Sequence, residues 1–362
     1  MRIGLLGLPQ SGKSTLLAAA SALARPGSGA EREREALTAT VGGLRQAVVP
    51  IADPRVDWLA QRLRPRKVTY ATAEWVELPA LAPAHVAELQ RVDVVVFVVR
   101  AFDPGQRSIP HPRGIVDPAA DFEALWQDWL LLDWGVLQNR LERLRTAPSI
   151  PKAQRRQVEE EIDLLQRCLA ALEAGTSLRR ANLSEADQSA LQGYSLVTFA
   201  PALVAVNIDD AEAAAAPSVP ILQVGQRCDA VVRVPARLEL ELARLDPQTR
   251  REFMRELGVE APLGVERLAA AALEAAQLIS FLTGNEQEVR AWTIRRGTVA
   301  REAAGKVHSD IARGFIRAEV IAFEDMQRAG SLARARELGL LRLEGKEYVV
   351  RDGDVIEFRF HV

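Results

Sequence analysis

Cysteine, net charge and long hydrophobic runs are scarce in this chain, and each scarcity excludes a class of protein. Two cysteines occur among 362 residues, far apart and without metal-ligand spacing, which argues against a disulfide scaffold or zinc site and fits a reducing compartment. Acidic and basic residues nearly cancel, 48 against 46, so no global charge attracts nucleic acid or an anionic membrane. The apolar residues of "IGLLGL" stop at Pro9, and no run approaches the roughly 20 apolar residues of a membrane span. We therefore expect a cytoplasmic protein with no membrane attachment.

The hydrophobic content of 48% is that of a globular protein, and the length allows two or three domains. Short apolar runs such as "RIGLLGL" and "DVVVFVVR" alternate with helix-forming stretches, which predicts a doubly wound α/β domain. After about residue 283 the alternating runs and the turn signal "RDGD" predict a small β-rich domain.

Between the predicted strands, apolar residues follow one another at steps of four and three. This spacing predicts two helices that pair in a coiled-coil-like hairpin inserted into the α/β domain. The predicted seam consists of Leu130, Trp134, Leu137, Leu141 and Leu144 on the first helix and Val158, Ile162, Leu165, Leu169 and Leu172 on the second.

The segment "GLPQSGKS", from Gly7 to Ser14, matches the P-loop or Walker A pattern G-x-x-x-x-G-K-[ST] between a strand and a helix. In such a loop the backbone N–H groups of residues 10 to 15 point at the β-phosphate, and the helix N-terminus favours negative charge. We expect Lys13 to bridge the β- and γ-phosphates and Ser14 to bind Mg²⁺. The predicted nucleotide-binding residues here are Pro9, Gln10, Ser11, Gly12, Lys13, Ser14 and Thr15.

A second motif follows the predicted strand "PALVAVNI". Asn207, Ile208 and Asp210 form an N-x-x-D arrangement, the position and residue types of the N-K-x-D base-specificity motif of GTPases, with isoleucine in place of lysine. Asn and Asp at a strand end are also ordinary turn formers. A second base-contacting loop after the next strand would contain Val234, Pro235 and Ala236.

These features together resemble the YchF family of Obg-related P-loop GTPases over essentially the whole length. The most specific stretches are "GLPQSGKSTL", "ADPRVDWLAQRLRP", "REFMRELGVEAPLGVERL" and "EVRAWTIRRGTVAREAAGKVHSDIARGFIRAEVIAF". The resemblance implies a nucleotide-binding G domain at 1–122 and 198–282, a helical insertion at 123–197 and a TGS-like β-grasp domain at 283–362. It also implies GTP or ATP as ligand with Mg²⁺, and a role linked to the ribosome or to stress. The choice between ATP and GTP stays open, because Asp210 stands where the family's ATP-associated motif has glutamate.

The segments that sense the γ-phosphate depart from the family pattern. Where the family has D-x-A-G, this chain has Glu77, Leu78, Pro79 and Ala80, and the following switch II is much shorter. Glu77 is the candidate for holding a water on the metal, as the family's aspartate does, and for assisting catalysis together with Lys13. In the altered switch I, Thr40 is the candidate metal ligand and Thr38 is nearly as good. His85 reads as a surface loop residue.

Two functions from different classes follow. The first is a slow GTPase or ATPase, since hydrolysis needs a positioned water and charge stabilisation that these changes impair. The second is a non-hydrolysing, nucleotide-stabilised factor that binds RNA or the ribosome through the helical arm and the TGS-like domain, where arginines cluster between 290 and 317. An RNA-associated structural protein with an empty P-loop is a third reading, which the intact "GKS" disfavours.

Overall fold

The computed structural model of the chain describes two compact units. The larger unit contains Arg2–Ala47 and Glu74–Ala272, and the smaller unit contains Met1, Val48–Ala73 and Leu273–Val362. No helix among the described residues is long and apolar enough to cross a membrane. The described residues are 1–23, 39–41, 43–78, 81, 85–102, 111–146, 151–213, 225–259 and 261–361.

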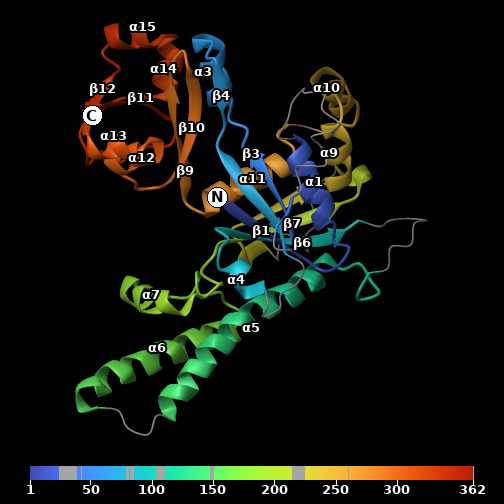
Figure 1. Ribbon diagram of the computed structural model, residues 1–362. Helices are drawn as coiled ribbons and strands as arrows, with labels where there is room; N and C mark the ends of the chain where they lie inside the picture. The colour runs from blue at the N-terminus through green and yellow to red at the C-terminus, as the bar shows by residue number, and fades with distance from the viewer. Residues whose placement is uncertain are drawn as a thin grey trace. The chain divides into compact units, whose positions relative to one another are not determined.

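The larger unit is built around a seven-stranded sheet (Figure 1) with the order β2-β3-β5-β1-β6-β7-β8. The strand β1 pairs in parallel with β5 and β6, and β6, β7 and β8 continue the parallel arrangement, whereas β2 and β3 are antiparallel. The order and the parallel pairing confirm the predicted α/β class. The bounds are β1 Arg2–Leu6, β2 Ala39–Val41, β3 Leu44–Pro50, β5 Thr72–Glu77, β6 Val94–Ala101, β7 Ala202–Ile208 and β8 Ala230–Val234.

The strand β6 is buried along nearly its whole length, as its unbroken branched sequence predicts. Phe97 lies edge-on to Phe122 and Trp129 and also contacts Trp126, all three from the first turns of α5, Pro118–Arg145. This aromatic cluster fixes α5 to one face of the sheet. Other helices of this unit are α1 Lys13–Leu23, α4 Val86–Leu89, α9 Ala236–Ala243, α10 Pro247–Glu256 and most of α11 Gly264–Ala275.

The predicted helical hairpin is present. The helix α5 starts at the N-cap Asp117 and runs antiparallel beside α6, Arg155–Glu173, as the colours of Figure 1 show. Buried seam leucines hold the pair together, among them Leu130, Leu137, Leu141, Leu165, Leu169 and Leu172. The short helix α7, Glu185–Leu191, follows with a capping box at Ser184.

The smaller unit contains a six-stranded sheet of order β12-β11-β13-β9-β10-β4. The hairpin β9–β10 is antiparallel, and the final strand β13 lies between β9 and β11, parallel to β9. With α12 packed on its core, this is the predicted β-grasp arrangement. The elements are β4 Lys67–Thr69, β9 Leu278–Gly284, β10 Glu288–Arg295, α12 Ala300–Val307, α13 Ser309–Arg313, β11 Phe315–Ala322, α14 Phe323–Ala329, α15 Leu332–Glu337, β12 Arg342–Glu344 and β13 Asp354–Phe360.

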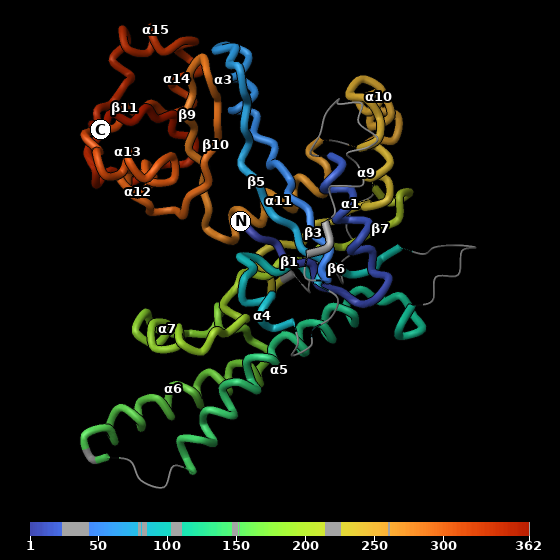
Figure 2. Tube along the Cα trace, viewed as in Figure 1, coloured from blue at the N-terminus to red at the C-terminus, as the bar shows by residue number. Residues whose placement is uncertain are grey.

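Residues 48–73 correct the division predicted from sequence, which placed them in the domain 1–122. Figure 2 follows the chain from β3 through α3, Pro54–Leu63, to β5. Within the smaller unit β4 pairs in parallel with β10, the Arg55 guanidinium lies 2.7 Å from Asp352, and Trp58 packs edge-on against Phe323. These contacts make the segment part of the β-grasp unit.

Candidate functional site

The P-loop joins the end of β1 to the start of α1, as the motif predicts. Its two motif glycines are required by space and by backbone conformation. A side chain at Gly7 would place its Cβ 2.5 Å from the carbonyl oxygen of Val98, and one at Gly12 would lie 2.0 Å from Asn207 Nδ2. Gly12 also has φ +95°, a value that disfavours side chains. Both positions therefore favour glycine, in a loop that leads to the N-terminus of α1.

Lys13 is the first residue of α1 and is buried, with 6% of its surface exposed. Its ammonium donates to the carbonyl oxygens of Gly7 at 2.8 Å and Leu8 at 3.0 Å, which are loop backbone groups. Burial lowers the Lys13 pKa, and the nearby Glu77 carboxylate opposes this shift. The Lys13 ammonium is therefore held inside the P-loop, the position from which it would contact phosphates.

Ser14 and Glu77 meet although 63 residues separate them. Ser14 Oγ lies 2.8 Å from Glu77 Oε1 and 2.9 Å from Oε2, and it donates its hydrogen to this carboxylate. The Arg45 guanidinium on β3 lies 3.9 Å from Glu77 Oε2. A hydroxyl beside a carboxylate is a donor set that suits Mg²⁺, so the residues present fit the ion that the motif implies. The described residues contain no group of three or more acidic, His or Cys ligands, so phosphate oxygens would have to supply other ligands.

Three of the residues predicted for the two switch segments lie outside the described residues, and a fourth lies in a short edge strand. Pro79, Ala80 and Thr38 are outside the described residues. Thr40 is in β2, where it pairs with Arg45 of β3. The Thr40 backbone therefore lies beside Arg45, the residue whose guanidinium is close to Glu77.

Asn207, the last but one residue of β7, holds the P-loop in place. Its Nδ2 donates to the Ser11 carbonyl oxygen at 3.0 Å, and its Oδ1 accepts from the Ala236 N–H at 3.3 Å. Both amide groups are therefore used within the protein, and the side chain is only 6% exposed. The sequence predicted a base-contacting residue, whereas the contacts described are those of a brace between two loops.

The other residues of the predicted base site differ in access. The Ile208 side chain is 5% exposed and packs in the main core, and Val234 and Ala236 are fully buried. Pro235 is buried as well. Asp210 is partly exposed, accepts from the Leu238 N–H at 3.1 Å, and has a pKa raised by burial. Of this group, Asp210 alone has a charged side chain, and that side chain is partly open to solvent. Pro9 and Gln10 are exposed at the loop, and Thr15 is half-buried in the first turn of α1.

Sequence reasoning missed two polar arrangements. One is Arg45, whose position opposite Glu77 follows from a strand pairing that no motif marks. The other is a buried pair at the start of α5, in which His111 Nε2 lies 2.7 Å from Asp121 Oδ2. His85, singled out as a surface residue, is half-buried at the N-cap of α4.

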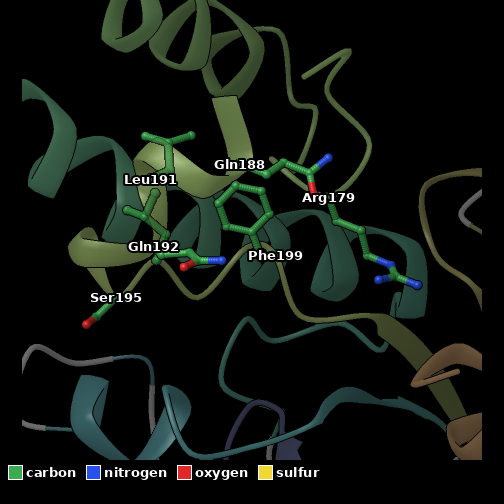
Figure 3. A pocket seen from close by; sticks show the side chains of 7 residues that line it. Arg179, Gln188, Leu191, Gln192, Ser195 and Phe199 are labelled. Atoms are coloured by element: carbon green, nitrogen blue, oxygen red, sulfur yellow. The ribbon is translucent and has the colours of Figure 1, made fainter. Parts of the chain in front are cut away.

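A cavity of about 400 Å³ lies at the base of the helical hairpin, beside α7 (Figure 3). It contains none of the residues predicted for the nucleotide site. Its lining mixes polar and apolar side chains, namely Arg179, Gln188, Leu191, Gln192, Ser195, Leu196 and Phe199.

Known proteins resemble this chain from end to end. "Ribosome-binding ATPase YchF" of Bacillus subtilis (strain 168) is 33% identical over 379 residues, covering 99% of each chain. The chain belongs to the YchF family. "Ribosome-binding ATPase YchF" of Escherichia coli O157:H7 is likewise 33% identical over 373 residues, covering 100% of this chain and 99% of the relative.

Two further comparisons agree with membership of the YchF family. The family model YchF-GTPase_C, described as "Protein of unknown function (DUF933)", matches residues 278–361, which lie in the smaller unit. The solved structure of the Schizosaccharomyces pombe YchF GTPase superposes with a TM-score of 0.84 at 24% identity, covering 99% of this chain and 97% of that one. At this identity the structural similarity establishes the fold.

Proposed function

We propose that the chain binds ATP or GTP with Mg²⁺ through its P-loop and acts in a ribosome-linked role. The observation that carries the proposal is the cluster of Lys13, Ser14 and Glu77 at the N-terminus of α1, with Asn207 bracing the loop. Relatives that match the chain over 99% of their own length are named ribosome-binding ATPases, which supports ATP as one ligand and the ribosome as partner.

In this proposal each site residue has a separate task. Lys13 neutralises charge on the β- and γ-phosphates, and the N–H groups of residues 10 to 15 bind phosphate oxygens. Ser14 and, on β2, Thr40 would provide oxygen ligands for Mg²⁺, which supplies charge neutralisation when bound, and Glu77 lies beside Ser14. Asp210 reads the base, beside the loop of Val234–Ala236.

We infer that hydrolysis is slow, because Glu77 and Ala80 replace the aspartate and the glycine of the family's γ-phosphate sensor. A single-turnover experiment tests this. Labelled ATP and GTP are titrated with Mg²⁺, and phosphate release is then followed with enzyme in excess. We expect saturable binding that Lys13→Ala abolishes and that Lys306→Ala, a lysine outside the P-loop on α12, leaves intact.

The alternative is a nucleotide-stabilised factor without turnover. Phosphate release no faster than in Lys13→Ala, with binding intact, would favour this alternative over the slow enzyme. Absence of binding to both nucleotides would refute both.

Contact with ribosomal RNA is proposed for the smaller unit, a TGS-like module. Its Arg290 guanidinium stacks 3.9 Å from the Trp292 ring centroid, a pairing that can also serve RNA backbones and bases. Other arginines there are paired with acids, as Arg359 is with Glu319 at 3.0 Å. Co-sedimentation with ribosomes should weaken in Arg290→Glu and persist in Arg359→Glu if the Arg290 side chain of β10 contacts the RNA.

A further inference from the structure

Glu77 touches Ser14 directly, with no room for a water between them. The separations from Ser14 Oγ are 2.8 and 2.9 Å to the two carboxylate oxygens. The position of Glu77 is set by the backbone, because it is the last residue of β5 and lies in parallel register with Leu5 of β1. The strand β1 leads straight into the P-loop, so the carboxylate and the loop are anchored by neighbouring strands.

These separations can be compared with the geometry of a bound Mg²⁺. Mg²⁺ binds six oxygens at about 2.0–2.1 Å in an octahedron, so adjacent ligand oxygens are about 2.9 Å apart. The observed distances between Ser14 Oγ and the Glu77 carboxylate oxygens match the edge of this octahedron. Ser14 Oγ and one oxygen of Glu77 can therefore bind one ion side by side, the hydroxyl hydrogen turning away from the carboxylate.

A carboxylate that acted through a metal-bound water would stand farther back. A hydrogen bond of about 2.7 Å added to the metal–water bond places such a carboxylate oxygen roughly 4 Å from the ion. Glutamate reaches one methylene beyond aspartate, which closes most of this gap. The reach of Glu77 thus favours direct contact.

The surroundings of Glu77 fit an anionic ligand. The side chain is 17% exposed, and it faces the Lys13 ammonium and, at 3.9 Å, the Arg45 guanidinium. These two cations balance the carboxylate when no divalent ion is present. The divalent cation adds positive charge and the phosphates add negative charge. When both bind together, these added charges offset each other around Glu77.

We propose that Glu77 is an inner-sphere ligand of the divalent cation that accompanies the nucleotide, beside Ser14, and that it takes the place of one water. This inference rests on the proposed nucleotide binding. It assigns Glu77 a role in fixing the metal rather than in sensing the γ-phosphate. A direct anionic ligand also makes metal retention depend on this side chain.

Manganese is the probe, because Mn²⁺ binds the same oxygen ligands and is paramagnetic. The full chain is loaded with ADP and Mn²⁺ in water enriched in oxygen-17. The broadening of the Mn²⁺ lines in the electron paramagnetic resonance spectrum then gives the number of water molecules bound to the ion. We expect one water fewer in the wild type than in Glu77→Asp. Mn²⁺ affinity, measured on the same complexes, should fall by more than about 100-fold in Glu77→Gln, because loss of a group that only hydrogen-bonds a metal ligand already costs about 10- to 100-fold.

Glu74→Gln is the matched control, since Glu74 lies on the same strand and pairs with Arg2 instead. It should leave both the water count and the Mn²⁺ affinity unchanged. An equal water count in wild type and Glu77→Asp would overturn the inference while nucleotide binding stands. Failure of ADP to bind, assayed separately by titration, would overturn the proposed function and the inference with it.

Discussion

Removing the Asn207 side chain tests whether this residue braces the P-loop. In Asn207→Ala the two hydrogen bonds to the Ser11 carbonyl and the Ala236 N–H are lost. Neutral hydrogen bonds contribute about 1 kcal/mol each, and a buried N–H left without an acceptor costs about 1–3 kcal/mol more. Ala236 is fully buried. We therefore expect the free energy of unfolding to fall by about 3 kcal/mol.

Urea unfolding followed by tryptophan fluorescence measures this loss, because Trp75, Trp126, Trp129 and Trp134 all belong to the larger unit. The matched control is Asn285→Ala. It deletes the same atoms from an exposed side chain, which accepts from the N–H groups of Gln287 and Glu288 in the smaller unit. The control should change stability by about 1 kcal/mol or less and leave nucleotide affinity intact, whereas Asn207→Ala should weaken affinity. A change below about 0.5 kcal/mol in Asn207→Ala, less than one hydrogen bond, would refute the bracing role.

Three other perturbations have outcomes fixed by the structure. Gly12→Ala should destabilise the chain by at least about 2 kcal/mol more than Gly43→Ala in thermal unfolding, because both have positive φ but only Gly12 has Asn207 within 4 Å. Glu239 is buried against two backbone N–H groups, and burial raises its pKa from 4.5 to about 7. The folded state then holds this proton more tightly than the unfolded state, so stability should decrease by about 3 kcal/mol between pH 4.5 and 7, and Glu239→Gln should remove that slope in urea titrations at several pH values. Asp133 accepts two backbone N–H groups and a hydroxyl; Asp133→Asn should lower the urea midpoint, and an unchanged midpoint would contradict that role.

Local patterns predicted the elements whose evidence is local. The P-loop followed from eight consecutive residues, and β6 followed from an unbroken branched run that the structure buries. The seam leucines such as Leu137 and Leu165 also followed, because a helical repeat shows which residues share a face.

Pairing between distant segments could not be predicted in the same way. The "RDGD" signal marks a turn before β13, but β13 pairs with β11 and β9, and β12 pairs with β11. A turn signal says where the chain bends and not which strand it will meet. For the same reason no motif indicated that β4 would pair with β10, about 220 residues later in the sequence.

The candidate site shows the same limit. Lys13 and Ser14 are placed by the motif itself, but the roles of Asn207 and Arg45 depend on contacts across the sheet. Ile208 was grouped with the base-binding residues by its place in N-x-x-D, whereas alternation along β7 directs its side chain to the core.

The segment 48–73 makes the β-grasp unit discontinuous along the chain, and this governs how the protein can be divided. A fragment limited to residues 278–361 would leave the edge of β10 unpaired and would lack the helix that brings Val56 and Leu59, both fully buried, into the unit. Removing the C-terminal residues would expose those same side chains. An exchange of this module between relatives must therefore carry both segments, and the two are expected to change together in sequence.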